Sequence, residues 1–151
     1  MPGKPKIMTV YGTRPEAIKV APVVSALQND DRFDSVVVST GQHREMLEQV
    51  NKRFGITPDY DMALMKPGQT LNELVSRAIK GLDPIIDEEM PDVIISQGDT
   101  STAMVAALAG FHKGVKIVHL EAGLRTGNIF SPFPEEANRK IIGQIASLHL
   151  A

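Results

Sequence analysis

Short runs of β-branched and other apolar residues alternate with longer segments of helical periodicity along the whole chain. The short runs predict strands at Lys6–Tyr11, Ser35–Thr40, Tyr60–Leu64, Pro91–Ser96 and Val115–Leu120. The longer segments predict helices at Pro15–Gln28, Arg44–Phe54, Ser101–Phe111 and Pro134–Ala146, with one more that begins at Thr70. Alternation of this kind is typical of right-handed βαβ units. We therefore expect an α/β fold, a three-layer, doubly wound parallel sheet of the Rossmann-like kind.

The helix that begins at Thr70 carries the clearest local signals. Thr70 and Glu73 have the spacing of a capping box, and a continuous apolar face follows them. The chain ends in Ser147–Ala151, which has the pattern of another strand at its start. We therefore expect residues 1–151 to form the first, N-terminal domain of a longer protein.

Composition narrows the function classes. The chain has 151 residues, 42% of them hydrophobic, which is enough for the core of one domain. A formal net charge of −2 and dispersed basic residues argue against a nucleic-acid partner. No apolar run approaches the roughly 20 residues of a membrane helix, so no membrane partner is expected. The absence of cysteine removes thiolate chemistry and fits a cytoplasmic location.

Polar clusters follow several of the predicted strands. They contain three carboxylates, Asp99, Glu121 and Glu135, and three cations, Arg14, Lys19 and Arg139. Because the carboxyl ends of parallel strands line up along one edge of a sheet, we expect these side chains to meet at one site. A cluster of acids and cations suits acid/base chemistry on an anionic substrate, and at least one carboxylate pKa should rise through mutual repulsion.

Simpler interpretations exist for each cluster. Asp99 precedes a helix and has the position of an N-cap, although Thr100 or Ser101 would serve equally. Glu135 and Arg139 have the spacing of an ordinary surface ion pair. Arg14 could pair locally and Lys19 could be solvated. The histidines show no metal-ligand spacing, so no metal site is expected.

Taken together, several long motifs resemble one family, the non-hydrolysing UDP-N-acetylglucosamine 2-epimerases of bacteria and archaea. They are GTRPEAIKVAPVV, STGQHREML, PDVIISQGDTSTAMVAALAGF, VHLEAGLRTG and PFPEEANRK, in an alignment that runs from Lys6 to Ala151. The resemblance implies a two-domain, glycosyltransferase-B-like fold of which residues 1–151 are the N-terminal half. In the family, the second domain carries most of the uridine diphosphate contacts and a catalytic histidine, and it lies outside this sequence.

The resemblance also implies roles for individual residues. Asp99, Glu121 and Glu135 correspond to catalytic acids, and Arg139 to their cationic partner. Arg14 and Lys19 correspond to contacts with the bound nucleotide. A further segment, Gln42, His43 and Arg44, resembles a region where some bacterial members bind a second UDP-N-acetylglucosamine as an activator. The family also suggests a homodimer that serves the synthesis of cell-surface polysaccharide.

The reaction that the resemblance implies inverts carbon 2 of the sugar and gives UDP-N-acetylmannosamine. That carbon has no acidic proton, so the route is either transient oxidation by a nicotinamide or elimination of UDP followed by its re-addition. The G-x-G-x-x-G fingerprint of a nicotinamide site is absent after the first strand, so elimination is favoured and no cofactor is expected. Alternatives are a hydrolysing 2-epimerase, a glycosyltransferase of the same fold, or a nucleotide-sugar-binding domain without catalysis. The 151 residues alone are expected to be inactive.

Overall fold

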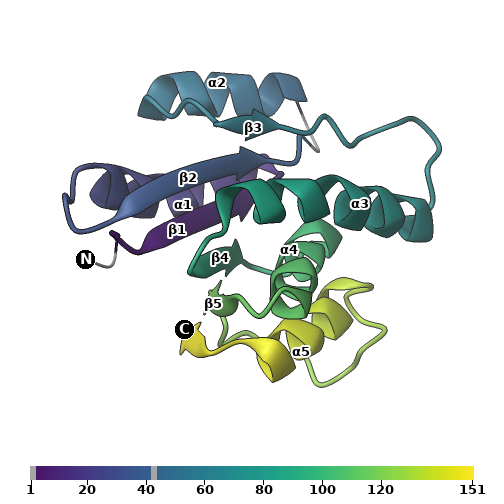
Figure 1. Cartoon of the computed structure of the whole chain (residues 1–151). Coiled ribbons are helices and arrows are strands. Elements are labelled where there is room, and N and C mark those ends of the chain that lie inside the picture. Colours follow the sequence, from purple (N-terminus) through teal and green to yellow (C-terminus); the bar gives the residue numbers. More distant parts are fainter. Residues whose placement is uncertain (1–2, 42–43) are drawn as a thin grey trace.

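The sheet order β3-β2-β1-β4-β5-β6 defines the fold, and every neighbouring pair of strands is parallel. The computed structural model describes residues 3–41 and 44–151 (Figure 1). The strands are β1 (Lys6–Tyr11), β2 (Asp34–Ser39), β3 (Tyr60–Asp61), β4 (Val93–Gln97), β5 (Lys116–Leu120) and β6 (Leu148–Leu150). The helices are α1 (Arg14–Gln28), α2 (Arg44–Phe54), α3 (Leu71–Glu89), α4 (Ser101–His112) and α5 (Glu135–Ile145).

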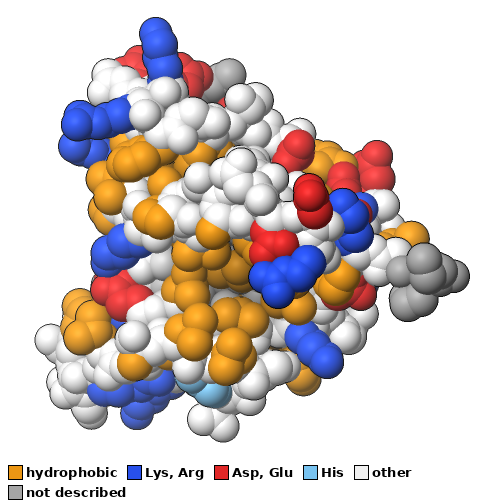
Figure 2. Space-filling view, turned by 90° about the vertical axis from the view of Figure 1, so that its left-hand side faces the viewer, with side chains coloured by type: hydrophobic (Ala, Val, Ile, Leu, Met, Phe, Trp, Pro, Cys, Tyr) orange, Lys and Arg blue, Asp and Glu red, His pale blue; other side chains and the backbone are white. Residues whose placement is uncertain are grey.

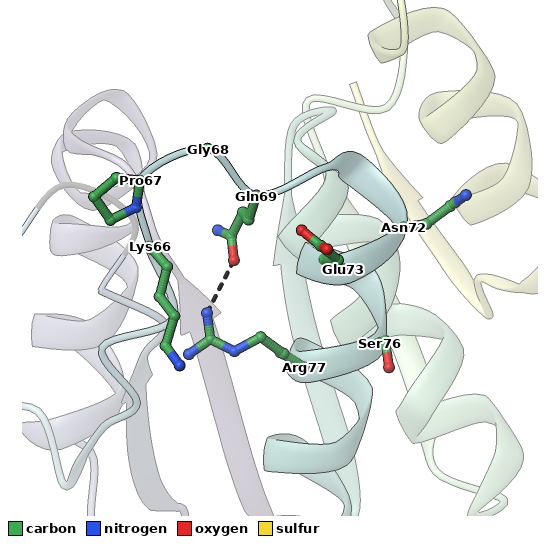
Figure 3. Close-up of a pocket in the computed structure, with 8 residues that line it drawn as sticks. All are labelled: Lys66, Pro67, Gly68, Gln69, Asn72, Glu73, Ser76 and Arg77. Atoms are coloured by element: carbon green, nitrogen blue, oxygen red, sulfur yellow. Dashed lines mark hydrogen bonds between the residues drawn. The ribbon is translucent and has the colours of Figure 1, made fainter.

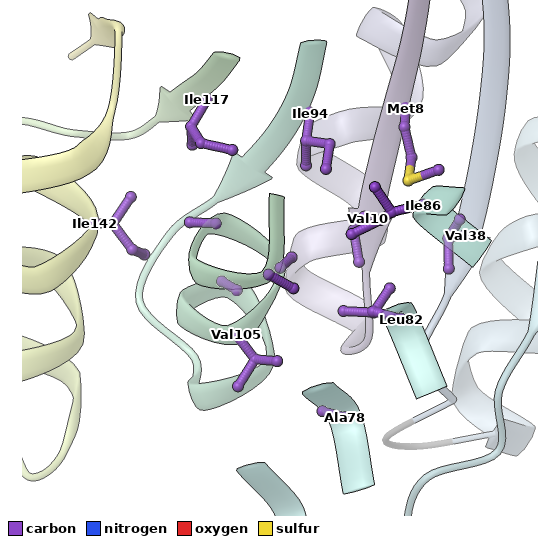
Figure 4. Close-up of a cluster of buried hydrophobic side chains, with 14 of the residues drawn as sticks. Met8, Val10, Val38, Ala78, Leu82, Ile86, Ile94, Val105, Ile117 and Ile142 are labelled. Carbon is purple, nitrogen blue, oxygen red and sulfur yellow. The ribbon is translucent and has the colours of Figure 1, made fainter. Parts of the chain in front are cut away.

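Helices cover both faces of the sheet. One cluster of buried side chains joins β1 and β2 to α1 and α2 through residues such as Val20, Val37 and Leu47. The other joins the opposite face to α3, α4 and α5, with Leu82, Val105 and Ile142 among its members (Figure 4). The expected three-layer, doubly wound arrangement is therefore confirmed. The strand order reverses between β1 and β4, which is where ligands bind in open sheets of this kind.

Most predicted elements lie within one or two residues of the observed bounds, and the capping box on α3 is confirmed. Thr70 Oγ1 accepts from the Glu73 backbone N–H at 3.1 Å, and Glu73 Oε2 accepts from the Thr70 N–H at 2.8 Å. The strand predicted at 60–64 is too long, because only Tyr60–Asp61 pairs with β2. Ala63 has a φ of 47°, and this left-handed conformation ends the extended segment.

Gly12, which follows β1, allows a close approach between neighbouring chain segments. A Cβ atom at this position would lie 1.9 Å from Thr40 Oγ1, and the Thr40 side chain is fully buried. Any other residue type would displace Thr40. The absence of a side chain at Gly12 therefore lets the turn between β1 and α1 lie directly against the segment that follows β2.

The surface carries mixed charge. On the face shown in Figure 2, hydrophobic side chains gather over the middle, and basic and acidic side chains are interspersed around them. This distribution agrees with the net charge of −2 and offers no patch of a single sign on that face. Within residues 3–41 and 44–151, no helix is long and apolar enough to cross a membrane.

Candidate functional site

A cavity of about 410 Å³ lies outside the carboxyl ends of β1, β4 and β5. Helix α1 contributes Glu16 and Lys19 to its wall, and α5 contributes Arg139. The β4–α4 turn contributes Asp99, and Glu121 follows directly after β5. Residues far apart in the sequence thus converge at the edge where the strand order reverses. Of the six residues in the predicted cluster, four line this cavity.

Arg139 connects the acids of two different strands. Its side chain comes from α5, is only 4% exposed, and places Nε and Nη2 each 3.0 Å from Asp99 Oδ2. Nη1 donates to the backbone carbonyl of Glu121, and Nη2 lies 3.9 Å from Glu121 Oε2. The interpretation of Glu135 and Arg139 as a surface ion pair is therefore wrong, because Arg139 is buried and its ion pairs are with Asp99 and Glu121.

Two side chains besides Arg139 hold the Glu121 carboxylate. Lys19 Nζ lies 2.8 Å and 2.9 Å from its two carboxylate oxygens, and Gln97 Nε2 donates to Oε2 at 2.5 Å. Burial raises the pKa of Glu121, but the bond and charge of Lys19, the charge of Arg139 and the bond from Gln97 outweigh it, so the pKa falls below its ordinary value. The expected rise through repulsion does not occur at Glu121, because cations separate the carboxylates.

Asp99 is not the N-cap of α4. Thr100 takes that position, and its hydroxyl oxygen accepts from the Ala103 N–H at 3.1 Å. The Asp99 side chain is thus free to pair with Arg139. The turn before it is fixed by His119, whose Nε2 lies 2.7 Å from the Gly98 carbonyl oxygen. Burial lowers the pKa of His119, so a neutral ring that donates from Nε2 fits this contact.

Glu135 lies in an adjoining cavity of about 210 Å³ at the start of α5. This cavity shares Asp99, Leu124 and Arg139 with the larger one. Glu135 Oε2 is buried and has no hydrogen-bond partner. The three predicted acids therefore occupy two neighbouring cavities that meet at Asp99 and Arg139.

Arg14 lies outside the main cavity. It is exposed in the first turn of α1, where it lines a depression of about 720 Å³ with Pro15, Ile18, Lys19 and Met46. Lys19 lines both this depression and the main cavity. The two cations predicted to contact a nucleotide therefore share one depression, which adjoins the cavity of the acids at Lys19.

The predicted activator segment is described only in part. Gln42 and His43 lie outside the described residues, and Arg44 is the first residue of α2. A separate hollow of about 700 Å³ beside the start of α3 contains none of the predicted site residues (Figure 3). There, Arg77 Nη1 donates to Gln69 Oε1 at 2.9 Å and to the Leu64 carbonyl at 2.7 Å.

No site role was predicted for Glu16 and Gln97, two polar residues that line the main cavity and bond within the site. Glu16 is buried and forms a capping box with Thr13 at the start of α1. The sequence contained a signal for this box, because Thr13 and Glu16 have the same spacing as Thr70 and Glu73. Gln97 ends β4, and nothing in the sequence pattern indicates that its amide donates to Glu121.

The fold and the site define the class of protein: a doubly wound α/β domain whose carboxylates and cations gather where the parallel sheet reverses its order, which is the place where such domains bind ligands. A family model for UDP-N-acetylglucosamine 2-epimerase matches residues 25–151. The UDP-N-acetylglucosamine 2-epimerase of Yersinia pestis is 55% identical over 97% of this chain. That of Escherichia coli strain K12 is 52% identical over the same share. The chain therefore belongs to the UDP-N-acetylglucosamine 2-epimerase family.

Solved structures agree. The UDP-GlcNAc 2-epimerase from Neisseria meningitidis bound to UDP-GlcNAc superposes on 97% of this chain with a TM-score of 0.93 and 46% identity. MurG of Acinetobacter baumannii superposes with a TM-score of 0.70 at 16% identity, which shows a shared fold. The chain spans 39% of the length of the Yersinia, Escherichia and Neisseria proteins.

Proposed function

We propose that the protein interconverts UDP-N-acetylglucosamine and UDP-N-acetylmannosamine without hydrolysis, with residues 1–151 forming one wall of the active site. The observation that carries the proposal is the convergence of Asp99, Glu121 and Arg139 on one cavity, with Glu135 in the cavity beside it. The Neisseria relative was solved with UDP-GlcNAc bound, and its first domain has the same fold.

The chemistry of the sugar explains why several acids are useful. Elimination of UDP requires a base for the carbon-2 proton and an acid that returns a proton to the opposite face. The sugar ring becomes cation-like as the glycosidic bond breaks, and a nearby carboxylate stabilises that charge. We propose that Asp99, Glu121 and Glu135 divide these tasks. Arg139 positions Asp99 and Glu121 and offsets their mutual repulsion.

The leaving UDP must stay in place, since otherwise water adds to the sugar. Cations beside the acids suit that task because they stabilise the charge that develops on the leaving group. Arg14 and Lys19 line the depression beside the cavity of the acids and are the proposed contacts to the nucleotide. Lys19 also forms an ion pair with Glu121. A proposed contact to UDP therefore touches a proposed catalytic acid directly.

Other features of the whole protein follow from family membership. We propose that it is a homodimer through helices of this domain, that it works in the cytoplasm where its charged substrate is dissolved, and that it supplies cell-surface polysaccharide synthesis. Gln42, His43 and Arg44 form the proposed activator site. Sedimentation velocity of the 151-residue chain tests self-association, and a monomer at 100-fold the working concentration would contradict a dimer through this domain.

The test of activity uses a chimera in which these 151 residues replace the matching part of the Yersinia pestis relative. The 151-residue chain alone is the companion sample. We expect the chimera to produce UDP-N-acetylmannosamine and the isolated chain to show no turnover, because one wall cannot exclude water from the cleft. A folded but inactive chimera, beside an active parent, would overturn the proposal.

The products distinguish the alternatives. Release of UDP together with free N-acetylmannosamine would indicate a hydrolysing enzyme. Incorporation of solvent deuterium at carbon 2 during turnover is expected for elimination and re-addition. In the chimera, Glu121→Gln should lower kcat by at least about 100-fold if the carboxylate takes part in proton transfer or charge stabilisation. A loss below about threefold would favour a glycosyltransferase, which does not need these acids.

A further inference from the structure

Glu16 has a buried carboxylate to which none of the roles above is assigned. The residue is only 4% exposed and lies in the first turn of α1. Its Oε2 accepts from the backbone N–H groups of Gly12 at 2.7 Å and Thr13 at 2.9 Å. Its Oε1 accepts from the Thr100 hydroxyl at 2.5 Å. Burial raises the pKa of Glu16 above its ordinary value, and the hydrogen bonds from these three donors oppose that rise.

These donors come from two different loops. Gly12 and Thr13 belong to the β1–α1 turn, whereas Thr100 caps α4 on the opposite face of the sheet (Figure 1). The first loop leads to Lys19, and the second carries Asp99. The carboxylate therefore bridges the two loops at the point where the strand order reverses.

The position of the carboxylate also concerns anion binding. In dinucleotide-binding folds, the backbone N–H groups between the first strand and its helix hold a phosphate. Here the corresponding N–H groups of Gly12 and Thr13 already donate to Glu16. A carboxyl group of the protein itself occupies the place of a ligand phosphate. These two N–H groups are therefore not available to the phosphates of a ligand.

We propose that Glu16 is a positioning residue that ties the β1–α1 turn to the N-terminus of α4 and so fixes Lys19 relative to Asp99 and Arg139. The structural part of this proposal stands on the three hydrogen bonds. Its consequence for turnover rests on the proposed function above.

The chain contains a matched control. The capping box of α3 has the same pattern, because Glu73 Oε2 accepts from the Thr70 N–H and Thr70 Oγ1 accepts from the Glu73 N–H. That box is exposed, and the bonds of the Glu73 carboxylate that the described structure shows stay within its own helix. A comparison of Glu16 with Glu73 therefore separates the bridge from ordinary helix capping.

The first experiment measures amide hydrogen exchange in the 151-residue chain for Glu16→Ala, Glu16→Gln, Glu73→Ala and Glu73→Gln. We expect Glu16→Ala to speed exchange at least tenfold both at residues 12–17 and at residues 101–104. Glu73→Ala should affect only the first turn of α3. Glu16→Gln should stay within about threefold of the parent, because its carbonyl oxygen can accept from both backbone donors while its amide donates to Thr100. Faster exchange confined to residues 12–17 would overturn the bridge.

A substitution on the other side tests the same contact if Glu16→Ala does not fold. Thr100→Asp keeps a good N-cap for α4 but places a second carboxylate against Glu16. Faster exchange at Gly12 and Thr13 in this variant would support the bridge. Unchanged exchange there would overturn it.

The second experiment measures kinetics in the chimera. We expect Glu16→Ala to lower kcat/KM for UDP-N-acetylglucosamine by about 10- to 100-fold, Glu16→Gln to restore most of it, and Glu73→Ala to match the parent. Parental kinetics for Glu16→Ala in an active chimera would overturn the positioning role. An inactive parent chimera would contradict the proposed function alone, because the exchange experiment tests the bridge without turnover.

Discussion

Lys19 in α1 and Glu121 at the end of β5 lie 102 residues apart in the sequence and form an ion pair with Nζ 2.8 Å from Oε1. The pair spans the cavity and joins a proposed nucleotide contact to a proposed catalytic acid. Both side chains are partly exposed, at 51% for Lys19 and 30% for Glu121, so solvent screens their attraction. The fold of the surrounding elements, more than the free energy of this one ion pair, therefore holds the two residues in the site.

A double-mutant cycle with Lys19→Met and Glu121→Gln measures that strength. We expect a coupling free energy of about 0.5 kcal/mol in urea unfolding at pH 7, as for other exposed pairs. Because the pKa of Glu121 is lowered from 4.5 in the folded chain, its stabilising contribution is fully present above pH 4.5. The contribution should disappear as the pH falls through the lowered folded-state pKa. A coupling that is unchanged at pH 2 would contradict the assignment.

Replacement of Arg139 tests how far the site depends on a buried cation. Arg139→Gln leaves Asp99 and Glu121 without their shared partner, so we expect a loss of about 2–3 kcal/mol in the free energy of unfolding. Arg139→Lys keeps the charge but lacks the fork that places Nε and Nη2 on Asp99, and should lose less. Lys140→Gln on the exposed side of the same helix is the control and should change stability little. Equal stability of Arg139→Gln and the control would refute the prediction.

The close contact between Gly12 and Thr40 in the turn after β1 can be tested by substitution. In Gly12→Ala, the new methyl group meets Thr40 Oγ1, and we expect a loss of about 2–3 kcal/mol from overpacking. Thr40 Oγ1 has no hydrogen-bond partner, so Thr40→Ala alone should cost about 1 kcal/mol or less. The double variant should therefore be more stable than Gly12→Ala, as thermal unfolding would show. Additive losses would mean that the two groups do not collide.

The end of α3 offers a stabilising change far from the site. Met90 is 77% exposed and has a φ of 46° at the C-cap, where glycine has no steric penalty. We expect Met90→Gly to raise the free energy of unfolding by about 0.5–1 kcal/mol. Met90→Ala removes the same side chain but keeps the penalty, so it should give no gain. Equal effects of the two substitutions would assign the change to the side chain.

Local signals in the sequence predicted most of the fold. Thr70 and Glu73 marked the start of α3 because capping depends only on residues three apart. The strand predicted at 60–64 was too long because Asp61 Oδ1 accepts from the Ala63 N–H in a local turn, which the apolar pattern of the segment does not indicate.

The site was predicted less completely, since its contacts depend on distant residues. Asp99, Glu121 and Glu135 were found as strand-end and helix-start acids, and the structure places them in two adjoining cavities. The family resemblance made Arg139 the cationic partner of these acids, and the structure pairs it with Asp99 and Glu121, whereas its i, i+4 spacing to Glu135 alone suggested a surface pair. Glu16 was overlooked because the capping pattern depends only on neighbouring residues and does not indicate the hydrogen bond to Thr100.

Glu121 has a φ of 62°, one of three non-glycine residues with positive φ in the described structure. A side chain in this conformation costs on the order of 1 kcal/mol relative to glycine. Selection of a variant library for thermal stability alone should therefore favour replacement of Glu121, whereas selection for turnover should retain it. Attempts to make the domain more robust should leave position 121 fixed and seek their gains elsewhere.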